Sequence, residues 1–444
     1  MSFWRRGAPH ALNVIVLCGL AVLFFDSAAS AATLCVNPSG ASGCYSTIGA
    51  AVKAASAGDL INIGTGQYAE GVVISKPLAL VGSGASSTII NARGLANGIY
   101  VDGLDNGGLS GVLVTGLTVT NANFEGILVT NTINSVISNN HVANNDQGLN
   151  FAAATCTGLP AFETSEGEDC GEGIHLIGTF AVTVSNNDVE LNSGGILLSD
   201  ETGETFENLI TGNSVHDNAL DCGITLASHP PSPQASSKLP YGVVSNNIVG
   251  NNVSRNGIAG EGAGIGVFAP GPGNVAFENK IIGNVILDNG LPGVTVHNHA
   301  APPGAPGVNL NDLVILGNYI SGNGADVQDS ATPGTAGINI YAVAPIYATQ
   351  ILENTIENEA LDVVINNPGG SALHLNNLLG GAVGVANLGT GTVDATLNYF
   401  GCASGPGTTG GCSSVSGKAI GSTPFLASPV PSAPAGPSGG RGPM

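Results

Sequence analysis

Two short motifs alternate along the middle of the chain. The first is Asn-x-(Val/Ile)-x-x-Asn, and its copies are Asn140–Asn145, Asn187–Asn192, Asn213–Asn218, Asn251–Asn256, Asn284–Asn289 and Asn318–Asn323. A further copy begins at Asn354, with Glu359 in place of the last Asn. The second motif is a Gly followed by alternating apolar residues, as in Gly126-Ile127 and Gly195-Ile196. Successive copies lie 22 to 47 residues apart, which is typical of a repeat protein.

The spacing of these motifs predicts a solenoid of stacked coils. Strands of three or four residues place alternate side chains inward, and one coil of about 22 residues buries its apolar face only by stacking on its neighbours. Asn tolerates the left-handed backbone of tight bends, and amide side chains stacked in register can bond from coil to coil. We therefore expect Asn ladders along the stack, with Gly where the chain turns sharply.

Both ends of such a stack need caps. Residues 46–55 read as a short amphipathic helix with Ser46 as its N-cap and an apolar face of Ile48, Ala51, Val52 and Ala55. We expect an N-terminal cap over residues 32–60 and the repeat domain over 61–415. The Pro-, Gly- and Ser-rich residues 416–444 read as a flexible tail.

The first 31 residues are typical of a secretory signal peptide, with Arg5 and Arg6 before the apolar run 14–25. An uncleaved anchor is the alternative, although this run is short for a bilayer span. The cysteines agree with export, because close pairs in an exported chain indicate local disulfides. The expected pairs are Cys35–Cys44, Cys156–Cys170 and Cys402–Cys412, with Cys222 left as a buried thiol. Zinc binding by these cysteines is the alternative, but no Cys-x-x-Cys pair is present.

Composition narrows the function classes. The 31 acidic residues outnumber the 10 basic ones and give a net charge of −21, so we expect no binding to nucleic acid. Hydrophobic residues make up 43% of the chain, which argues against disorder. No segment after the signal is long and apolar enough to predict a membrane span.

One block near the start resembles a known family. Residues 58–68 (GDLINIGTGQY), followed by Glu70, Val73-Ile74-Ser75-Lys76 and Leu80-Val81-Gly82, are similar to the opening of right-handed parallel β-helix proteins. The chain resembles the pectin-lyase-like superfamily over residues 35 to 415, including its NosD-like periplasmic proteins and pectin methylesterases. The resemblance implies an all-β fold, a right-handed parallel β-helix solenoid with an N-terminal amphipathic helix cap. It also implies a carbohydrate-related role, but no particular reaction.

The catalytic signatures of this superfamily do not occur in the chain. The Asn-Thr-Asp, Gly-His-Gly and Arg-Ile-Lys motifs of polygalacturonases and the Trp-Ile-Asp-His motif of pectate lyases are all missing. The single Trp, Trp4, belongs to the signal. These differences argue against the well-known chemistries of the superfamily.

A binding surface can be sought by counting from each repeat Gly, since the second and fourth residues after it should point outward. Phe268, His297 and Tyr341 occupy the fourth position in three consecutive coils, about 4.8 Å apart. His175 occupies the second position in an earlier coil. We expect these residues to form an exposed strip that stacks on the rings of a sugar chain. The alternative is that they pack under the loops 269–278, 298–311 and 342–349.

Acid–base chemistry on a glycoside needs two nearby carboxylates. Asp200, Asp217 and Asp221 are the catalytic candidates, with Glu201 next to Asp200 and His229 on the next coil. Solvated loop acids are the alternative interpretation.

The acidic insertion before Gly173 suggests a metal site. Glu166, Glu168 and Asp169 offer the hard oxygen ligands that calcium prefers, so calcium is the candidate cofactor, and no other cofactor is indicated. A simply solvated loop is the alternative. His175, His297 and His299 raise a further possibility, copper or zinc.

The sequence therefore predicts a secreted, cell-surface or periplasmic protein whose partner is a polysaccharide or a cell-surface glycan. A non-catalytic binding role along the side of the solenoid is favoured. A polysaccharide lyase or glycoside hydrolase is the alternative.

Overall fold

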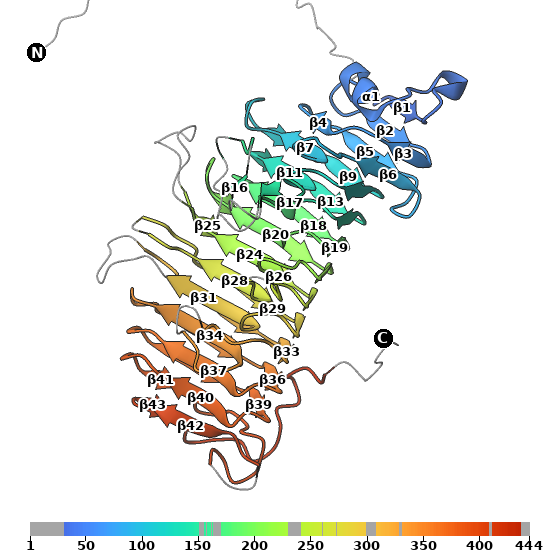
Figure 1. Cartoon of the computed structure of the whole chain (residues 1–444). Coiled ribbons are helices and arrows are strands. Elements are labelled where there is room, and N and C mark those ends of the chain that lie inside the picture. Colours follow the sequence, from blue (N-terminus) through green and yellow to red (C-terminus); the bar gives the residue numbers. More distant parts are fainter. Residues whose placement is uncertain are drawn as a thin grey trace, which may run out of the picture.

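The computed structural model describes residues 31–150, 155–156, 158–160, 162, 170–229, 241–259, 261–271, 273–298, 308–327, 331–407 and 411–436. Within these residues the chain winds into a stack of coils, and each full coil contributes one strand to each of three long parallel sheets (Figure 1). The expected parallel β-helix is confirmed. The residues of the expected signal peptide lie outside the described residues, except for Ala31.

Sheet A has 14 strands, in the order β1 (Thr33–Val36), β2 (Leu60–Ile63), β5 (Ala79–Gly82), β9 (Leu113–Thr115), β13 (Val136–Ser138), β18 (Thr183–Ser185), β22 (Leu209–Thr211), β26 (Asn247–Val249), β29 (Lys280–Ile282), β32 (Val314–Leu316), β35 (Thr349–Leu352), β38 (Ser371–His374), β41 (Val393–Asp394) and β43 (Ile420–Gly421). Sheet B has 11 strands, namely β3 (Gly66–Tyr68), β6 (Thr88–Asn91), β10 (Thr118–Thr120), β14 (His141–Ala143), β19 (Asp188–Glu190), β23 (Ser214–His216), β27 (Asn252–Ser254), β30 (Val285–Leu287), β33 (Tyr319–Ser321), β36 (Thr355–Glu357) and β39 (Asn377–Leu379).

Sheet C has 12 strands, namely β4 (Val72–Ile74), β7 (Ile99–Asp102), β11 (Ile127–Thr130), β17 (Glu172–Ile177), β20 (Gly194–Ser199), β24 (Ile224–Ala227), β28 (Ile265–Phe268), β31 (Val294–Asn298), β34 (Ala336–Ala342), β37 (Leu361–Asn366), β40 (Val383–Asn387) and β42 (Ser414–Gly417). Three two-stranded sheets lie in the connections, formed by β8 (Leu109–Ser110) with β12 (Thr132–Ile133), β15 (Leu149–Asn150) with β16 (Thr155–Cys156), and β21 (Thr205–Phe206) with β25 (Val243–Val244).

The core lies inside the stack and is made of aligned apolar rows. In sheet C, Ile127 pairs with Ile174 and Val129 with Leu176, and all four side chains are fully buried. The first and third residues after each repeat Gly therefore point inward, as the alternation of a strand requires. The repeat Gly itself lies against the next coil, since a Cβ at Gly195 would lie 2.2 Å from the carbonyl oxygen of Gly223.

The expected Asn ladders are present. In the longest, each Asn after the first accepts two hydrogen bonds on Oδ1, from the backbone N–H and the side-chain amide of the Asn one coil earlier. Asn251 donates both bonds to Asn284, and Asn284 donates both to Asn318, over 2.9–3.0 Å. This ladder runs through Asn140, Asn187, Asn213, Asn251, Asn284, Asn318, Asn354, Asn376 and Asn398. A second ladder runs from Asn145 through Asn323 to Glu359, which accepts the last two bonds.

The N-terminal helix α1 (Ile48–Ala54) covers the first coil with the expected apolar face. Its N-cap is Thr47 and not Ser46, because the Thr47 hydroxyl accepts from Ala50 N. The carboxylate of Glu70 accepts from Ile48 N and Gly49 N, which satisfies two further free donors of the first turn. A short 3-10 turn, η1 (Ala41–Gly43), precedes this helix.

The C-terminal segment differs from the expected flexible tail. The strands β42 and β43 extend sheets C and A beyond residue 415, and the following residues run back along the stack (Figure 1). Val430 is buried and exchanges two hydrogen bonds with the side chain of Asn377. The ladder Asn398 explains part of this order, because its carbonyl accepts from Leu426 N. The Pro-, Gly- and Ser-rich composition of this segment did not indicate these hydrogen bonds of Leu426 and Val430.

Three disulfides, Cys35–Cys44, Cys156–Cys170 and Cys402–Cys412, confirm the expected pairs, and Cys222 is free and buried. Across the described part of the chain, no helix is both long and apolar enough to cross a membrane.

The corners of the stack differ in regularity. From sheet A to sheet B the connection has two residues in each coil from β13 to β39. The first has a positive φ, as at Asn186 (54°) and Gly283 (63°), and the second is a ladder Asn. The connections on the two edges of sheet C vary from coil to coil, and the longest are residues 144–171 and 228–246. Variable side chains are therefore concentrated around sheet C.

Candidate functional site

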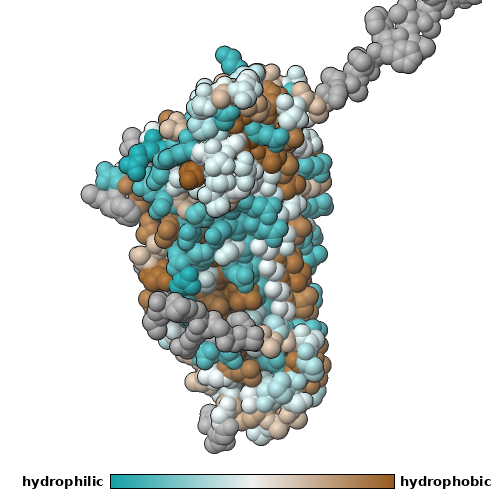
Figure 2. Space-filling view, turned by 90° about the vertical axis from the view of Figure 1, so that its right-hand side faces the viewer, coloured by the Kyte–Doolittle hydropathy of each residue, from teal (hydrophilic) through white to brown (hydrophobic). Residues whose placement is uncertain are grey.

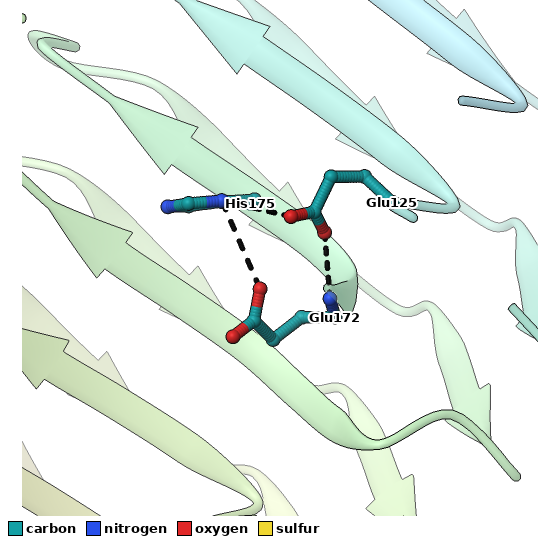
Figure 3. A group of neighbouring side chains, drawn as sticks. All are labelled: Glu125, Glu172 and His175. Carbon is teal, nitrogen blue, oxygen red and sulfur yellow. Dashed lines mark hydrogen bonds and ion pairs between the residues drawn. The ribbon is translucent and has the colours of Figure 1, made fainter. Parts of the chain in front are cut away.

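The outer face of sheet C carries a cluster of polar side chains where β17 and β20 pair. His175 lies at its centre, with Nδ1 3.1 Å from Glu125 Oε1 and 3.7 Å from Glu172 Oε2 (Figure 3). On the other side, His175 Nε2 lies 2.7 Å from Ser199 Oγ, and Ser199 contacts Glu201. We call these residues the His175 cluster, defined as Glu125, Glu172, His175, Ser199, Glu201 and His229.

The position of the protons in the His175 cluster follows from its hydrogen bonds. Glu201 accepts from the Ser199 hydroxyl and from His229 Nδ1, the latter over 2.6 Å. The one hydroxyl proton of Ser199 is then used, so Ser199 Oγ can only accept a hydrogen bond from His175 Nε2. In a Ser-His-acid triad the serine donates to the imidazole instead. The order Glu125–His175–Ser199 is that of a triad, but the Ser199 hydroxyl is directed to Glu201 and not to the imidazole.

The acidic groups next to Ser199 have pKa values shifted in opposite directions. Burial, reinforced by the charge of Glu201, raises the pKa of Asp200 to about 7, although hydrogen bonds from Ser228 and the His229 amide oppose this. Burial alone would also raise the pKa of Glu201, but the attraction and hydrogen bond of His229, with contributions from His175 and Ser199, lower it to about 2. Glu201 is 1% exposed and Asp200 is fully buried. One carboxyl is therefore near its protonation midpoint at neutral pH beside an ionised one, and both are out of contact with solvent.

The expected convergence of Asp200, Asp217 and Asp221 does not occur. Asp200 follows the last residue of β20, whereas Asp217 and Asp221 precede β24, which pairs in parallel with β20. The two sites therefore lie at opposite ends of these strands. Asp217 has a positive φ of 56° before the ladder residue Asn218, and its carboxylate is bonded to Arg255. Asp221 lies beside Cys222, and burial together with this carboxylate raises the pKa of the thiol well above its usual range.

The expected aromatic row is present on the sheet C face. Phe268 and His297 meet edge to face with ring centres 5.8 Å apart, and His297 and Tyr341 do so at 5.6 Å. The three rings are carried at matching positions of β28, β31 and β34. Their expected exposure was wrong for His297, which is 2% exposed because Asp326 and Asn339 contact its Nε2 at 3.0 Å.

Phe268 and Tyr341 remain half-buried. The Phe268 ring lies over Gly266, since a Cβ at this glycine would lie 2.4 Å from Phe268 Cε2. The chain thus offers two partly exposed rings separated by a buried imidazole. A flat, partly apolar surface of this kind suits the face of a sugar ring, and the one imidazole of the row, His297, is buried.

The residues proposed as metal ligands differ in where they lie. Glu166, Glu168, Asp169 and His299 lie outside the described residues. Glu172 from the same insertion lies in the His175 cluster, and with Glu125 and His175 it forms one of three groups in the described residues whose potential ligand atoms lie within 4.8 Å of one another. Glu125 Oε2 also accepts from Glu172 N over 2.6 Å, so this buried group is already tied by hydrogen bonds within the protein. His175 and His297, raised together as copper or zinc ligands, belong to separate polar groups.

Glu125 and Ser199 were missed by the sequence reasoning, whereas Glu201 was named beside Asp200 as an acid that follows a strand. Glu125 directly precedes the repeat Gly126, and Glu172 directly precedes Gly173 one coil later. An acidic residue at the same position of two consecutive coils was a signal that could have placed these side chains next to each other. Ser199 carried no such signal, because its contact with Glu201 depends on the course of the connection after β20.

A shallow open groove of about 470 Å³ lies away from this chemistry, along the last strands of sheet A. It is lined by residues 348–350, 370–372, 392–394, 419 and 421, and Asp394 is its only ionisable residue. The groove therefore offers no acid–base pair.

Comparison with known proteins bears on the fold. A family model described as the right handed beta helix region matches residues 79–400. No curated protein sequence matches the chain. Among solved structures, DFA-IIIase from Arthrobacter chlorophenolicus A6 without its lid is 13% identical, with a TM-score of 0.53, over 85% of this chain and 94% of that one.

Two further solved structures have lower TM-scores. Alginate lyase from Paenibacillus sp. str. FPU-7 is 12% identical over 88% of this chain and 99% of that one, with a TM-score of 0.42. The A-module of the Azotobacter vinelandii mannuronan C-5 epimerase AlgE4 is 16% identical over 78% and 93%, with a TM-score of 0.46. At such identities the likeness concerns the fold alone.

Proposed function

The chain belongs to the right-handed β-helix family, and from this premise we propose that it is an exported protein that binds a polysaccharide on the outer face of sheet C without cleaving it. The observation that carries the proposal is the row Phe268–His297–Tyr341, whose outer rings are partly exposed between variable connections. The three disulfides support export, because such bonds persist in oxidising compartments.

The same face argues for binding rather than cleavage. The ionisable side chains of the His175 cluster are nearly fully buried, and the hydroxyl proton of Ser199 is committed to Glu201. A nucleophile or general acid must reach the scissile bond, within hydrogen-bond distance of the reacting atom. We assign the cluster a structural role, in which the imidazole of His175 joins three coils through its contacts with Glu125 and Ser199.

The charge of the chain favours a neutral glycan. With a net charge of −21, a polyanionic chain such as alginate or pectate would meet repulsion over much of the surface. We therefore expect a neutral polysaccharide or cell-surface glycan to bind more tightly than an acidic one at low salt.

The test is a panel of neutral and acidic polysaccharides, with binding measured by calorimetry for the wild type and for the double variant Phe268→Ala/Tyr341→Ala. Each ring should contribute about 1 kcal/mol, so the double variant should bind roughly 10- to 30-fold more weakly. His374→Ala, on the outer face of sheet A, is the matched control and should bind as the wild type does. Equal binding by the double variant and the wild type to every glycan would reject the proposal.

A carbohydrate-active enzyme is the second candidate, and one observation favours it. The neighbouring carboxyls Asp200 and Glu201 have pKa values of about 7 and about 2, and a pair pushed apart in this way is typical of acid–base catalysis. The same panel is therefore assayed for new reducing ends and for the ultraviolet absorbance of unsaturated products. Turnover that is abolished in both Asp200→Asn and Glu201→Gln would favour the enzyme over the binding protein.

A further inference from the structure

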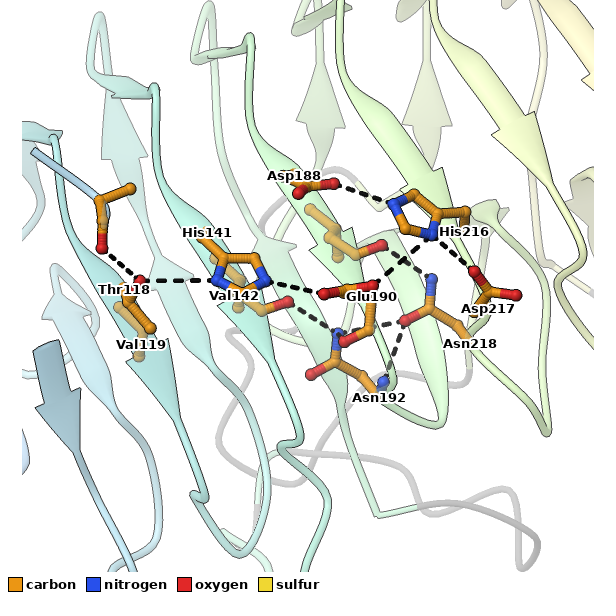
Figure 4. A network of polar contacts seen from close by, with 12 residues as sticks. Thr118, Val119, His141, Val142, Asp188, Glu190, Asn192, His216, Asp217 and Asn218 are labelled. Atoms are coloured by element: carbon orange, nitrogen blue, oxygen red, sulfur yellow. Dashed lines mark hydrogen bonds and ion pairs between the residues drawn. The ribbon is translucent and has the colours of Figure 1, made fainter. Parts of the chain in front are cut away.

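A second group of ionisable side chains lies on the opposite part of the coils, on the outer face of sheet B. It comprises side chains of β14, β19 and β23 and of the turn after β23 (Figure 4), and we call it the sheet B cluster, defined as His141, Asp188, Glu190, His216 and Asp217. Figure 2 turns the right-hand side of Figure 1 toward the viewer, and hydrophilic residues cover much of the middle of that face. The side chains of the cluster are 20–51% exposed, so a solute can reach them.

The register of the three strands brings the imidazoles and carboxylates together along diagonals. His141 pairs with Asp188, and Glu190 pairs with His216. The other partners of Glu190 and Asp188 are the small residues Ala143 and Ser214, which leave room for the diagonal contacts. His141 Nε2 accordingly lies 3.0 Å from Glu190 Oε1, and His216 Nε2 lies 3.0 Å from Asp188 Oδ1.

The backbone beneath the cluster is fixed by an Asn ladder. Asn145, Asn192 and Asn218 follow the three strands by two residues, and their side-chain amides are joined by hydrogen bonds of 3.0 and 3.1 Å. Figure 4 shows Asn192 and Asn218 directly beside the ionisable side chains. The strands therefore hold their outward side chains at constant spacing, which lowers the cost of organising a binding site.

The cluster carries an excess of negative charge. Its acidic members are Asp188, Glu190 and Asp217. The hydrogen bond with Asp217 is the main cause that raises the pKa of Arg255, and the nearby charge of Asp288 raises it further. Arg255 is bound to Asp217 through Nε and Nη2, at 2.7 and 2.6 Å. One guanidinium thus lies near three carboxylates, Asp217, Asp288 and Glu190, and a divalent cation would relieve the remaining repulsion.

We propose that His141, Asp188 and Glu190 bind a divalent transition-metal ion of the zinc class, with an open coordination position for water or a ligand. The potential ligand atoms of these residues lie within 4.8 Å of one another, and none of the three side chains is bonded to Arg255. One imidazole nitrogen and two carboxylate oxygens are ligands that zinc accepts in open, three-residue sites, whereas calcium takes oxygen ligands alone. His216 then acts as a neighbour of the site, because its contact with Asp188 orients that carboxylate.

The overlapping group Glu190, His216 and Asp217 fits the ion less well. Asp217 is engaged by two hydrogen bonds from Arg255, which together with the His216 contact hold the pKa of Asp217 below its usual value. A metal at this position would have to displace the guanidinium. The assignment to His141, Asp188 and Glu190 is therefore the one that leaves the Arg255 pair intact.

The experiment is a calorimetric titration of the purified, tag-free protein with zinc chloride at pH 7.5, with calcium chloride as a second titrant. The site predicts one zinc equivalent, no heat from calcium at the same concentration, and weaker zinc binding at pH 5, where protons compete for the imidazole. His141→Ala and Glu190→Gln should each weaken binding at least tenfold. His374→Ala removes another surface imidazole beside a single carboxylate, Asp394, and should bind as the wild type does.

Two outcomes would overturn the proposal: no zinc binding by the wild type, or unchanged affinity in His141→Ala with circular dichroism showing a native fold. Asp217→Asn distinguishes the two overlapping groups. Affinity within about twofold of the wild type supports the assignment, whereas a loss as large as that of His141→Ala would move the ion to the other group and contradict it.

Discussion

The corner between sheets A and B and the outer face of sheet C belong to the same coils but are built differently. At the corner, each coil repeats one positive-φ residue and one ladder Asn, as in Gly250-Asn251 and Gly283-Asn284. On the sheet C face, consecutive coils carry different side chains, for example His175, Leu197 and Thr225 at matching positions. The corner sets the spacing and register of the stack, and this regularity leaves the other face free to vary.

Polar groups are treated differently in the two regions. In the ladder each buried amide is neutral and has its partners supplied by the coils on either side. Beside sheet C the buried polar groups are acids and imidazoles whose partners come from three coils and from a connection that varies in length. The Asn ladder can be predicted from the sequence repeat, whereas the acid–imidazole contacts beside sheet C depend on the path of individual loops.

The largest expected effect is the loss of stability that follows from breaking the Asn ladder. Asn284→Ala removes the acceptor of Asn251 N and Nδ2 and the donor to the Ile248 carbonyl and Asn318. Leaving several buried groups unsatisfied should lower the free energy of unfolding by about 3 kcal/mol or more. Chemical denaturation followed by circular dichroism measures it. Asn247→Ala, a partly exposed Asn of sheet A, is the control, and a loss in it equal to that of Asn284→Ala would show that the ladder has no special role.

The second effect is the pH dependence of stability. Burial raises the pKa of Asp146 to about 8 and that of Asp200 to about 7, well above the ordinary value of 3.8 for an aspartate. An acid whose pKa is higher in the folded chain binds its proton more tightly there, so its stabilising contribution is complete below about pH 4 and is lost as the pH rises to about 8. Thermal unfolding from pH 4 to 9 should therefore show declining stability.

The variant Asp200→Asn should flatten this decline between about pH 4 and 7, because the amide does not titrate. Asp217→Asn is the comparison on the other side of the molecule, where hydrogen bonds from Arg255 lower the pKa. It should leave the decline in place. Identical pH profiles for the wild type and Asp200→Asn would contradict the assigned burial of this carboxyl.

A smaller effect concerns the aromatic row. Gly266→Ala places a Cβ against the Phe268 ring, which must move from its position over the strand. Glycan binding should weaken by roughly tenfold, about 1.4 kcal/mol, while the fold is retained. Calorimetry with the best-binding glycan measures this. Unchanged affinity together with a displaced ring would mean that Phe268 does not contact the glycan.

The smallest effect on stability is expected for an exposed ion pair next to sheet B. Arg255 and Asp217 form a bidentate pair, but the two side chains are 48% and 34% exposed. Exposed pairs contribute at most about 1 kcal/mol, so Arg255→Ala should change the unfolding free energy by less than that. If Arg255→Ala lost nearly as much unfolding free energy as Asn284→Ala, surface ion pairs and not the Asn ladder would dominate the stability of this part of the stack.

What the sequence could predict follows the same division. The repeat predicted the ladders, the inward rows and the positions of Phe268, His297 and Tyr341, because equal spacing places equal positions side by side. It did not predict that His297 would be buried by Asp326, since that aspartate lies in a connection with no counterpart in other coils. The separation of Asp200 from Asp217 and Asp221 was also missed. These residues are close in sequence, but Asp200 follows one strand of sheet C whereas the other two precede the next strand, so they lie at opposite ends of the sheet.

The most direct test of the central claim, that the outer face of sheet C is the glycan-binding surface, is hydrogen exchange measured with and without the polysaccharide that binds best. The account predicts slower exchange in β28, β31 and β34, with β27, β30 and β33 of the same coils unchanged. Protection confined to the sheet B strands, or no protection in sheet C at saturating glycan, would contradict it.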